Sequence, residues 1–243
     1  MERGFWATWY DLPPAEAPRF LDWLHASYLP ILSARPGWSW VAHYRYRGGG
    51  PQMDEVKTRV VSHTDDDIGR GTQYLLLAAA PSPHVFFAPR VDEIEGPPGC
   101  AEMLALREGL RTAAFVQEAR VEGPSSPGSQ AVSPPAPAIQ MGTLRARTLD
   151  AGFDLIAWYA QYRLPSMARM TGCVRTRKLA GIAGWPQHGI LYEFESLAMR
   201  LAHFERGHES LALDQAHWTG RITRASWHAP GSPFIGERTW PPV

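Results

Sequence analysis

Two kinds of side chain in this sequence suit chemistry on a small molecule: an imidazole in one predicted strand and regularly spaced arginines in others. His43 alternates with Arg45 along an aromatic segment, so both lie on the same face of that strand. The unperturbed pKa of an imidazole is near neutrality, which suits proton transfer at physiological pH. We therefore predict His43 as a catalytic residue. The alternative is a structural histidine, either satisfied in the core or exposed to solvent.

Arginines recur at alternate positions of two predicted strands. Arg145 shares one face of its strand with a second arginine, and Arg175 does the same in another strand. Guanidinium groups bind carboxylates and phenolates through charge-assisted hydrogen bonds, so we predict both residues as substrate-binding. The alternative is that these arginines pair with Glu193 and Glu195 across the sheet.

A duplicated segment carries the remaining candidates. Residues 23–37 read WLHASYLPILSARPG and residues 158–172 read WYAQYRLPSMARMTG, with Trp, Leu-Pro and Gly at the same spacing and a constant offset of 135. A proline inside a helix removes a backbone donor, so we expect a kink at each Leu-Pro pair. Immediately before these pairs stand Tyr28 and Arg163. We predict Arg163 as an anchor for an anionic group, and Tyr28 either as a hydrogen-bond donor or as part of the apolar stripe of its helix.

Apolar periodicity predicts the same order of elements twice, β-α-β-β-α-β, which is the ferredoxin-like unit. The first copy is predicted as strand 5–12, helix 15–35, strand 38–47, strand 72–79, helix 101–110 and strand 113–121, with a short extra strand at 56–62. The second copy is predicted as strand 138–147, helix 152–169, strand 173–179, strand 188–195, a helix capped by Ser196 and strand 221–228.

The chain therefore divides into two units, a linker and a tail. A sheet with helices on one face leaves its other face bare, and two units can bury those faces against each other. The predicted fold is α+β, two tandem ferredoxin-like units packed as a pseudo-dimeric α/β barrel. The predicted ranges are 1–122 for the first unit with insertions at 48–71 and 81–99, 123–138 for a Pro/Ser/Gly-rich linker, 139–228 for the second unit and 229–243 for a surface tail.

Composition excludes several classes of function. Lys plus Arg (24) equals Asp plus Glu (24), and a neutral chain is poorly suited to a phosphate backbone, so we expect no nucleic-acid partner. No long apolar window occurs, so no membrane span is expected. Two separated cysteines and the lack of a signal-peptide pattern indicate a cytoplasmic protein. No HExxH, phosphate-loop or nucleophile-elbow motif occurs, so we predict no metal site and no cofactor, and we interpret Asp65–Asp67 as a solvated loop.

The duplicated helix resembles the dimeric α/β-barrel superfamily, in particular its EthD-like members. Their helix reads roughly W-Y-x-x-x-H-L-P and is followed by P-G and a strand. The resemblance covers residues 5–47 and 139–205. Where that family has histidine before Leu-Pro, this sequence has Tyr28 and Arg163, so the family histidine is retained in neither copy.

The resemblance implies a cofactor-independent small-molecule enzyme, a monooxygenase, cyclase or isomerase that acts on an aromatic or polyketide-like compound. The expected pocket lies between the bare sheet face and the first helix of one unit. A non-catalytic ligand-binding or scaffold protein is one alternative, and a haem-binding member with His43 or His188 as axial ligand is another. Which unit is active, and whether the chain forms a homodimer, stays open. The expected pocket residues are Trp9, Tyr10, Trp40 and His43 in the first unit and Arg145, Arg163, Arg175 and Tyr192 in the second.

Overall fold

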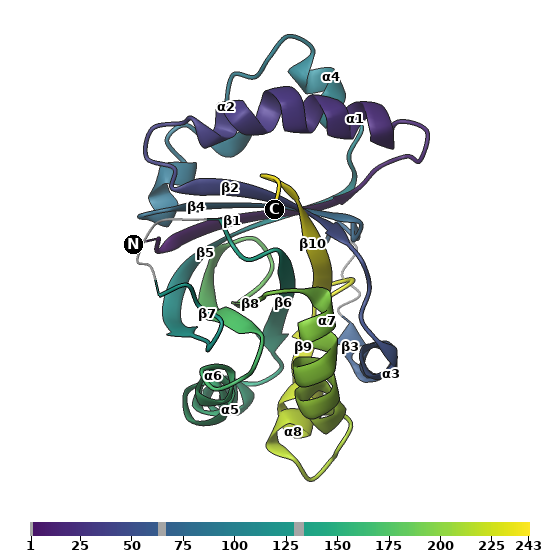
Figure 1. Cartoon of the computed structure of the whole chain (residues 1–243), viewed down its shortest axis with the longest axis vertical. Helices are drawn as coiled ribbons and strands as arrows, with labels where there is room; N and C mark the ends of the chain where they lie inside the picture. The colour runs from purple at the N-terminus through teal and green to yellow at the C-terminus, as the bar shows by residue number, and fades with distance from the viewer. Residues whose placement is uncertain (1, 63–66, 129–133) are drawn as a thin grey trace.

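A closed barrel of antiparallel strands forms the centre of the molecule (Figure 1). The computed structural model describes residues 2–62, 67–128 and 134–243. In this part of the chain the barrel strands follow the order β10-β2-β4-β1-β5-β7-β8-β6, and β6 pairs with β10 to close the ring. These strands are β1 (Gly4–Asp11), β2 (Trp40–Tyr46), β4 (Tyr74–Ala80), β5 (Glu108–Glu122), β6 (Ala138–Ala146), β7 (Cys173–Ala183), β8 (His188–Phe194) and β10 (Phe234–Trp240).

Each half of the chain contributes four barrel strands in the same relative order. Numbered within each half, that order is fourth, first, third, second: β5-β1-β4-β2 in the first half and β10-β6-β8-β7 in the second. The halves meet at two seams, where β5 pairs with β7 and β10 pairs with β2. The barrel is therefore shared equally between the two halves.

The last barrel strand differs from the prediction. Most of the strand predicted at 221–228 is helix α8 (Trp218–Arg224), and only β9 (Ser226–His228) is extended, at the edge of β6. The predicted surface tail 229–243 instead contains β10. Because β10 is hydrogen-bonded on both sides, to β2 and to β6, its pairing rather than its local sequence makes it a strand.

Apolar side chains from all eight strands fill the barrel. Inward and outward positions alternate along β2 as predicted, so Trp40 faces the interior. Its indole Nε1 donates to Oε1 of Glu2 at 3.2 Å. Trp9 also faces the interior, with the guanidinium of Arg111 4.7 Å from its ring centre. These two predicted substrate-binding tryptophans therefore pack in the barrel core and line no helix–sheet pocket.

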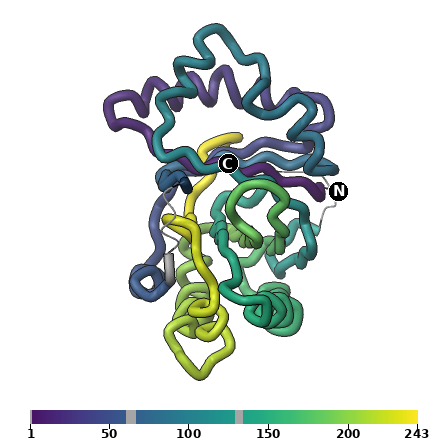
Figure 2. The backbone as a smooth tube through the Cα atoms, turned by 180° about the vertical axis from the view of Figure 1, so that it is seen from behind, coloured from purple at the N-terminus to yellow at the C-terminus, as the bar shows by residue number. Residues whose placement is uncertain are grey.

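The main helices of the two halves cover opposite sides of the barrel (Figures 1 and 2). Each is one continuous helix made of three segments with a π-helical middle. The predicted helices at 15–35 and 152–169 thus form. In the first half the segments are α1 (Ala17–Trp23), η1 (Leu24–Tyr28) and α2 (Leu29–Ser33), and in the second they are α5 (Leu149–Trp158), η4 (Tyr159–Arg163) and α6 (Leu164–Met167).

The kink predicted at each Leu-Pro pair takes the form of a π-helical turn. The N–H of Leu29 donates to the carbonyl of Leu24, and the N–H of Leu164 donates to the carbonyl of Tyr159. Proline has no N–H and crowds the preceding turn, and the wider π turn accommodates both effects. The residue just before each Leu-Pro pair, Tyr28 or Arg163, is thereby fixed at the end of a π segment.

The first-half insertion 48–71 folds largely as a helix, in place of the strand predicted at 56–62. Helix α3 (Pro51–Arg59) has proline in its first turn, where the missing N–H costs nothing. Only β3 (Val61–Ser62) is extended, and it pairs with β9. The insertion therefore reaches across to the second half, and Figure 1 shows α3 beside the helices of that half.

Two predictions concern the remaining helices. The helix predicted at 101–110 is shorter than expected, since α4 ends at Leu104. The predicted N-cap is confirmed, since Ser196 Oγ accepts from the N–H of Met199. Asp65, Asp66 and linker residues 129–133 lie outside the described residues, and no described helix is long and apolar enough to cross a membrane. The remaining described helical elements are η2 (Pro83–Phe86), η3 (Val91–Glu93), α4 (Cys100–Leu104), α7 (Leu197–Met199), η5 (Arg200–Glu209) and η6 (Ser210–Ala212).

Candidate functional site

A cavity of about 80 Å³ lies in the layer between helix and barrel in the second half. Its floor is the outer face of β6 and β8, and one wall is the helix that contains η4. The floor is open at Gly142, where an added Cβ would meet no atom within 4 Å. The lining residues are Val56, Val60, Gln140, Gly142, Trp158, Tyr159, Arg163, Ile190, Tyr192, Glu209, Thr223, His228, Ser232 and Pro233.

Arg163 is the cation of this cavity. It is 4% exposed, and its guanidinium carbon lies 4.6 Å from the ring centre of Trp158, 5.2 Å from that of Phe204 and 5.9 Å from that of Tyr192. Its Nε and Nη1 are buried and make no hydrogen bond to any described residue. Aromatic faces stabilise a cation, but a buried guanidinium without an anion remains costly. Arg163 therefore offers free donors to an anionic ligand.

A buried carboxylate, Glu209, lines the same cavity, and a chain of hydrogen bonds fixes its position. Nε of Arg200 donates to Oε1 of Gln140 at 2.7 Å, and Nε2 of Gln140 donates to Oε1 of Glu209 at 3.2 Å. Because arginine can only donate, the carbonyl oxygen of the Gln140 amide must face Arg200. The amide nitrogen must then face Glu209, and the carboxylate is held at the cavity wall.

The remaining polar groups of the cavity are neutral at physiological pH. Burial is the largest effect on His228 and lowers its pKa to about 4, and its Nε2 has no partner among the described residues. Burial also raises the pKa of Tyr159 and of Tyr192, whose hydroxyl oxygens lie 3.5 Å apart. An unprotonated imidazole can accept a proton, and a phenol can donate a hydrogen bond.

The roof of the cavity comes from the first half of the chain. Val56 of α3 and Val60 beside it line the cavity. The N-terminus of α3 is held by Glu205, whose carboxylate accepts from the N–H of Gly50 at 2.8 Å and of Met53 at 3.2 Å. A Cβ at Gly50 would lie 2.3 Å from Oε1 of Glu205, so only glycine permits this approach. Helix α3 of the insertion 48–71 is therefore a cover over the second-half cavity.

In the equivalent layer of the first half, the space around His43 is filled by a buried polar chain. The hydroxyl of Tyr10 lies 2.8 Å from Nε2 of His43, and Nδ1 of His43 lies 2.7 Å from Oγ1 of Thr239 and 3.2 Å from Nε2 of His25. His43 is fully buried; burial, and next the neighbouring His25, lower its pKa to about 3. Tyr28 is buried on its helix and stacks on the Trp23 ring. The structural alternative thus describes both Tyr28 and His43, which meet their partners inside packed layers.

The other two predicted arginines lie away from the cavity. The guanidinium of Arg145 stacks on the ring of Trp185, 5.0 Å from its centre, and Nε donates to the Trp185 carbonyl. Arg175 is buried at one end of the barrel, with Nε 3.1 Å from Glu122 and Nη1 3.6 Å from Glu193. For Arg175 the alternative pairing with Glu193 is the one observed. Of the predicted second-unit residues, the structure brings only Arg163 and Tyr192 together.

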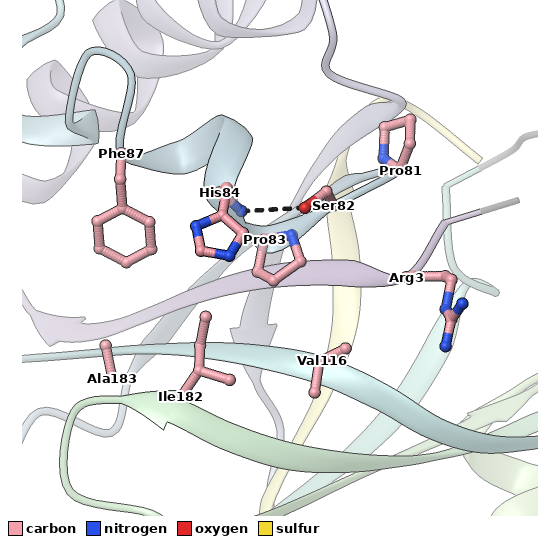
Figure 3. A pocket seen from close by; sticks show the side chains of 9 residues that line it. All are labelled: Arg3, Pro81, Ser82, Pro83, His84, Phe87, Val116, Ile182 and Ala183. Carbon is pink, nitrogen blue, oxygen red and sulfur yellow. Dashed lines mark hydrogen bonds between the residues drawn. The ribbon is translucent and has the colours of Figure 1, made fainter.

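A larger hollow lies on the surface. One groove of about 830 Å³ runs between η2 and the β5–β7 pair (Figure 3). Its walls are mainly apolar, from Phe87, Val116 and Ile182. The hydrogen bond drawn in Figure 3, from the His84 N–H to Ser82 Oγ at 3.4 Å, is a helix cap. The groove lacks a buried charge, so we place the candidate site at the cavity that contains Arg163.

The cavity that contains Arg163 does not fit a haem. A cofactor pocket typically has about 300–1,000 Å³, whereas the cavity of the second half has about 80 Å³. Neither proposed axial histidine lines it: His43 is enclosed in the first half, and Nδ1 of His188 lies 3.0 Å from Nζ of Lys178.

Comparison with known proteins identifies the fold. No family model and no curated protein matches the chain. Among solved structures, a candidate chlorite dismutase matches with a TM-score of 0.57 and 15% identity, over 98% of this chain and 95% of that one. An anthrone oxidase-like protein gives 0.56 and 11%, over 98% and 90%, and a dye-decolorizing protein from V. cholerae gives 0.51 and 12%, over 98% and 94%. The fold is that of the dimeric α/β-barrel proteins. At these identities the likeness shows the fold alone, and it does not distinguish EthD-like members from the others.

Three residues of the site were not predicted from the sequence. Gln140 lies on the outer face of a predicted strand, where a single amide carries no signal. Glu209 lies at the end of η5, a ten-residue π-helical segment that has no sequence signature. His228 was assigned to a barrel strand. A buried pattern broken by one polar residue, as at Gln140 between Ile139 and Met141, was the only hint available.

Proposed function

We propose that this protein is a small-molecule enzyme that binds an anionic substrate in the cavity of the second half and works without a cofactor. The observation that carries the proposal is Arg163, a buried guanidinium that lines this cavity and has two donors without a partner among the described residues. The neighbours named for oxidase, dye-decolorizing and dismutase activities are enzymes of small molecules, which agrees with this class of function.

The proposed chemistry is removal of a proton from a carbon next to a carboxylate or carbonyl group. The C–H bond breaks and its proton goes to Nε2 of His228, the electron pair of that bond forms a carbon–carbon double bond, and the π pair of the C=O bond moves onto the oxygen beside Arg163. Arg163 stabilises the charge that develops on the oxygen. The tyrosines 159 and 192 keep their protons at neutral pH and can hydrogen-bond the same oxygen. An enolate of this kind is the common intermediate of the isomerase, cyclase and monooxygenase reactions expected from the resemblance.

The volume of the cavity limits the size of the substrate. An apolar cavity of about 150 Å³ holds a benzene ring, and the cavity here has about 80 Å³. The aromatic or polyketide-like substrate expected from the sequence is therefore larger than this cavity. We propose a smaller substrate in its place.

We also propose that the two halves are a tandem duplication of an EthD-like ferredoxin unit. The identical strand order and the π turn before each Leu-Pro pair support this proposal. The second unit then extends from β6 to β10, so its boundary moves from residue 228 to about residue 240.

The test of the proposed function is proton exchange measured by NMR in deuterated buffer. Acetate, pyruvate and lactate are incubated with the full chain, with an Arg163→Gln variant and with an Arg145→Gln control. We expect deuterium to enter at least one substrate next to its carboxylate or carbonyl with the wild type and the control, but not with Arg163→Gln. Binding of these acids without exchange would favour the rival function, a non-catalytic ligand-binding protein, and exchange that survives in Arg163→Gln would contradict the role of Arg163.

A further inference from the structure

The cavity presents two opposite charges to whatever occupies it. Arg163 and Glu209 both line it and are both more than nine-tenths buried. No hydrogen bond joins the two among the described residues, because Nε and Nη1 of Arg163 have no partner and Glu209 is bonded to Gln140. Opposite charges that are both removed from water normally pair with each other, since each pays a desolvation cost. Here each charge keeps free hydrogen-bonding capacity toward the cavity.

The position of Glu209 is set from outside the cavity. Gln140 uses its amide nitrogen for Oε1 of Glu209, and Arg200 holds the amide oxygen, so the amide cannot turn. Oε2 of Glu209 receives no hydrogen bond from any described side chain or backbone group. A carboxylate has acceptor sites on both oxygens, so Oε2 is available to a donor on the ligand.

We infer that the ligand is a small 2-hydroxy or 2-amino carboxylate, with its carboxylate on Arg163 and its hydroxyl or ammonium group on Glu209. This inference rests on the proposed function, because it describes the occupant of the same cavity. A water molecule takes about 30 Å³ of liquid, so the cavity of about 80 Å³ holds only a few heavy atoms. Glycolate, glycine and lactate are of this size. Acetate has the same carboxylate without the donor, and it is the natural comparison.

Gln140 is a positioning residue in this arrangement. It contacts Glu209 and aims Oε2 at the ligand, and it also passes the link on to Arg200. Replacing Gln140 with Glu would place a second carboxylate beside Glu209, and the donor preference would then change without any change at Arg163.

The test is isothermal titration of the folded chain with glycolate, glycine and acetate at matched ionic strength. A hydrogen bond to a charged group favours the donor-bearing ligands, and we expect them to bind about tenfold or more tightly than acetate. In Glu209→Gln that preference should fall to about twofold or less while acetate affinity is retained. In Arg163→Gln all three ligands should lose affinity, and the Arg145→Gln control should behave as the wild type.

The outcomes separate this inference from the proposed function. Equal affinity for acetate and glycolate in the wild type would overturn the inference and leave an anion site at Arg163. No binding of any carboxylate by the folded wild type would overturn both. The wild-type comparison needs no variant, so it decides the inference even where a substitution prevents folding.

Discussion

The two halves of this molecule build the same layer of helix on barrel, and they fill it differently. In the first half Tyr10 and His43 occupy the layer and are hydrogen-bonded to each other. In the second half the floor carries Gly142, which leaves space that no side chain fills. At the π turn the first half places Tyr28 in an aromatic stack, and the second half places Arg163 beside a cavity. The same layer can thus be packed around its polar groups in one half and keep room for a ligand at Arg163 in the other.

The largest expected effect on stability comes from a substitution that releases α3, the cover of the cavity. Glu205 is buried, pairs with the buried Arg200 and holds the N-terminus of α3. Breaking a buried pair leaves an uncompensated charge, so Glu205→Gln should lower the free energy of unfolding by about 3–5 kcal/mol. Urea denaturation measures this value. Proteolysis should then cut the chain near α3 first.

A matched control tests whether burial is the cause. Glu237 pairs with Arg47, and both side chains are close to half exposed. Glu237→Gln should cost less than about 1 kcal/mol because solvent screens the pair. An equal loss of unfolding free energy in the two variants would show that burial does not strengthen the link between α3 and the second half.

The next effect concerns ligand binding and tests the space above Gly142 directly. Gly142→Leu should fill the cavity and weaken binding of small carboxylates by about 100-fold, or roughly 2.7 kcal/mol, as measured by calorimetry. Gly142→Ala adds only a Cβ, which meets nothing within 4 Å, and its φ is not positive. That control should keep the fold and raise the free energy of unfolding by about 0.4–1 kcal/mol. Undiminished binding by the folded leucine variant would place the ligand elsewhere.

The smallest effect is a change in histidine pKa on ligand binding, which should differ between His43 and His228. Folding lowers the pKa of His43 to about 3 and of His228 to about 4, mainly through burial. The unfolded chain therefore binds more protons below pH 6.5, and stability falls as pH drops from about 6.5 toward these values, by up to about 1.4 kcal/mol per pH unit for each histidine.

A bound carboxylate should change only one of them. An anion in the cavity favours the charged imidazole of His228 and should raise its pKa, whereas the pKa of His43 in the closed layer should not move. NMR titration of the histidine ring protons with and without lactate checks this. Equal shifts at both histidines would mean that the ligand does not act locally.

The sequence predicted the frame of the fold well because periodicity is local. The helices at 15–35 and 152–169, the alternation along β2 and the cap at Ser196 all formed. The last strand was missed, because residues 234–240 owe their extension to partners on both sides. Helix α3 was missed because its N-terminus is stabilised by Glu205, more than 150 residues away.

The site was predictable only where one helix carried it. The spacing of the duplicated segment singled out Arg163, and the strand pattern singled out Tyr192. The alternation along β2 puts His43 on the opposite face of the strand from Trp40, but a sequence does not show that a helix closes over that face. Glu209, Gln140 and His228 meet Arg163 only through the tertiary fold.

The most direct test of the central claim is urea unfolding of the wild type and of Arg163→Met, each in sodium acetate and in sodium chloride at equal ionic strength. If Arg163 is an unpaired anion anchor, the variant in chloride should be as stable as the wild type or more stable, by up to about 4 kcal/mol. Acetate at about 100 times its dissociation constant should stabilise the wild type by about 2.7 kcal/mol and the variant not at all. A variant that is several kcal/mol less stable than the wild type, or that gains as much from acetate, would contradict the account and make Arg163 a structural residue.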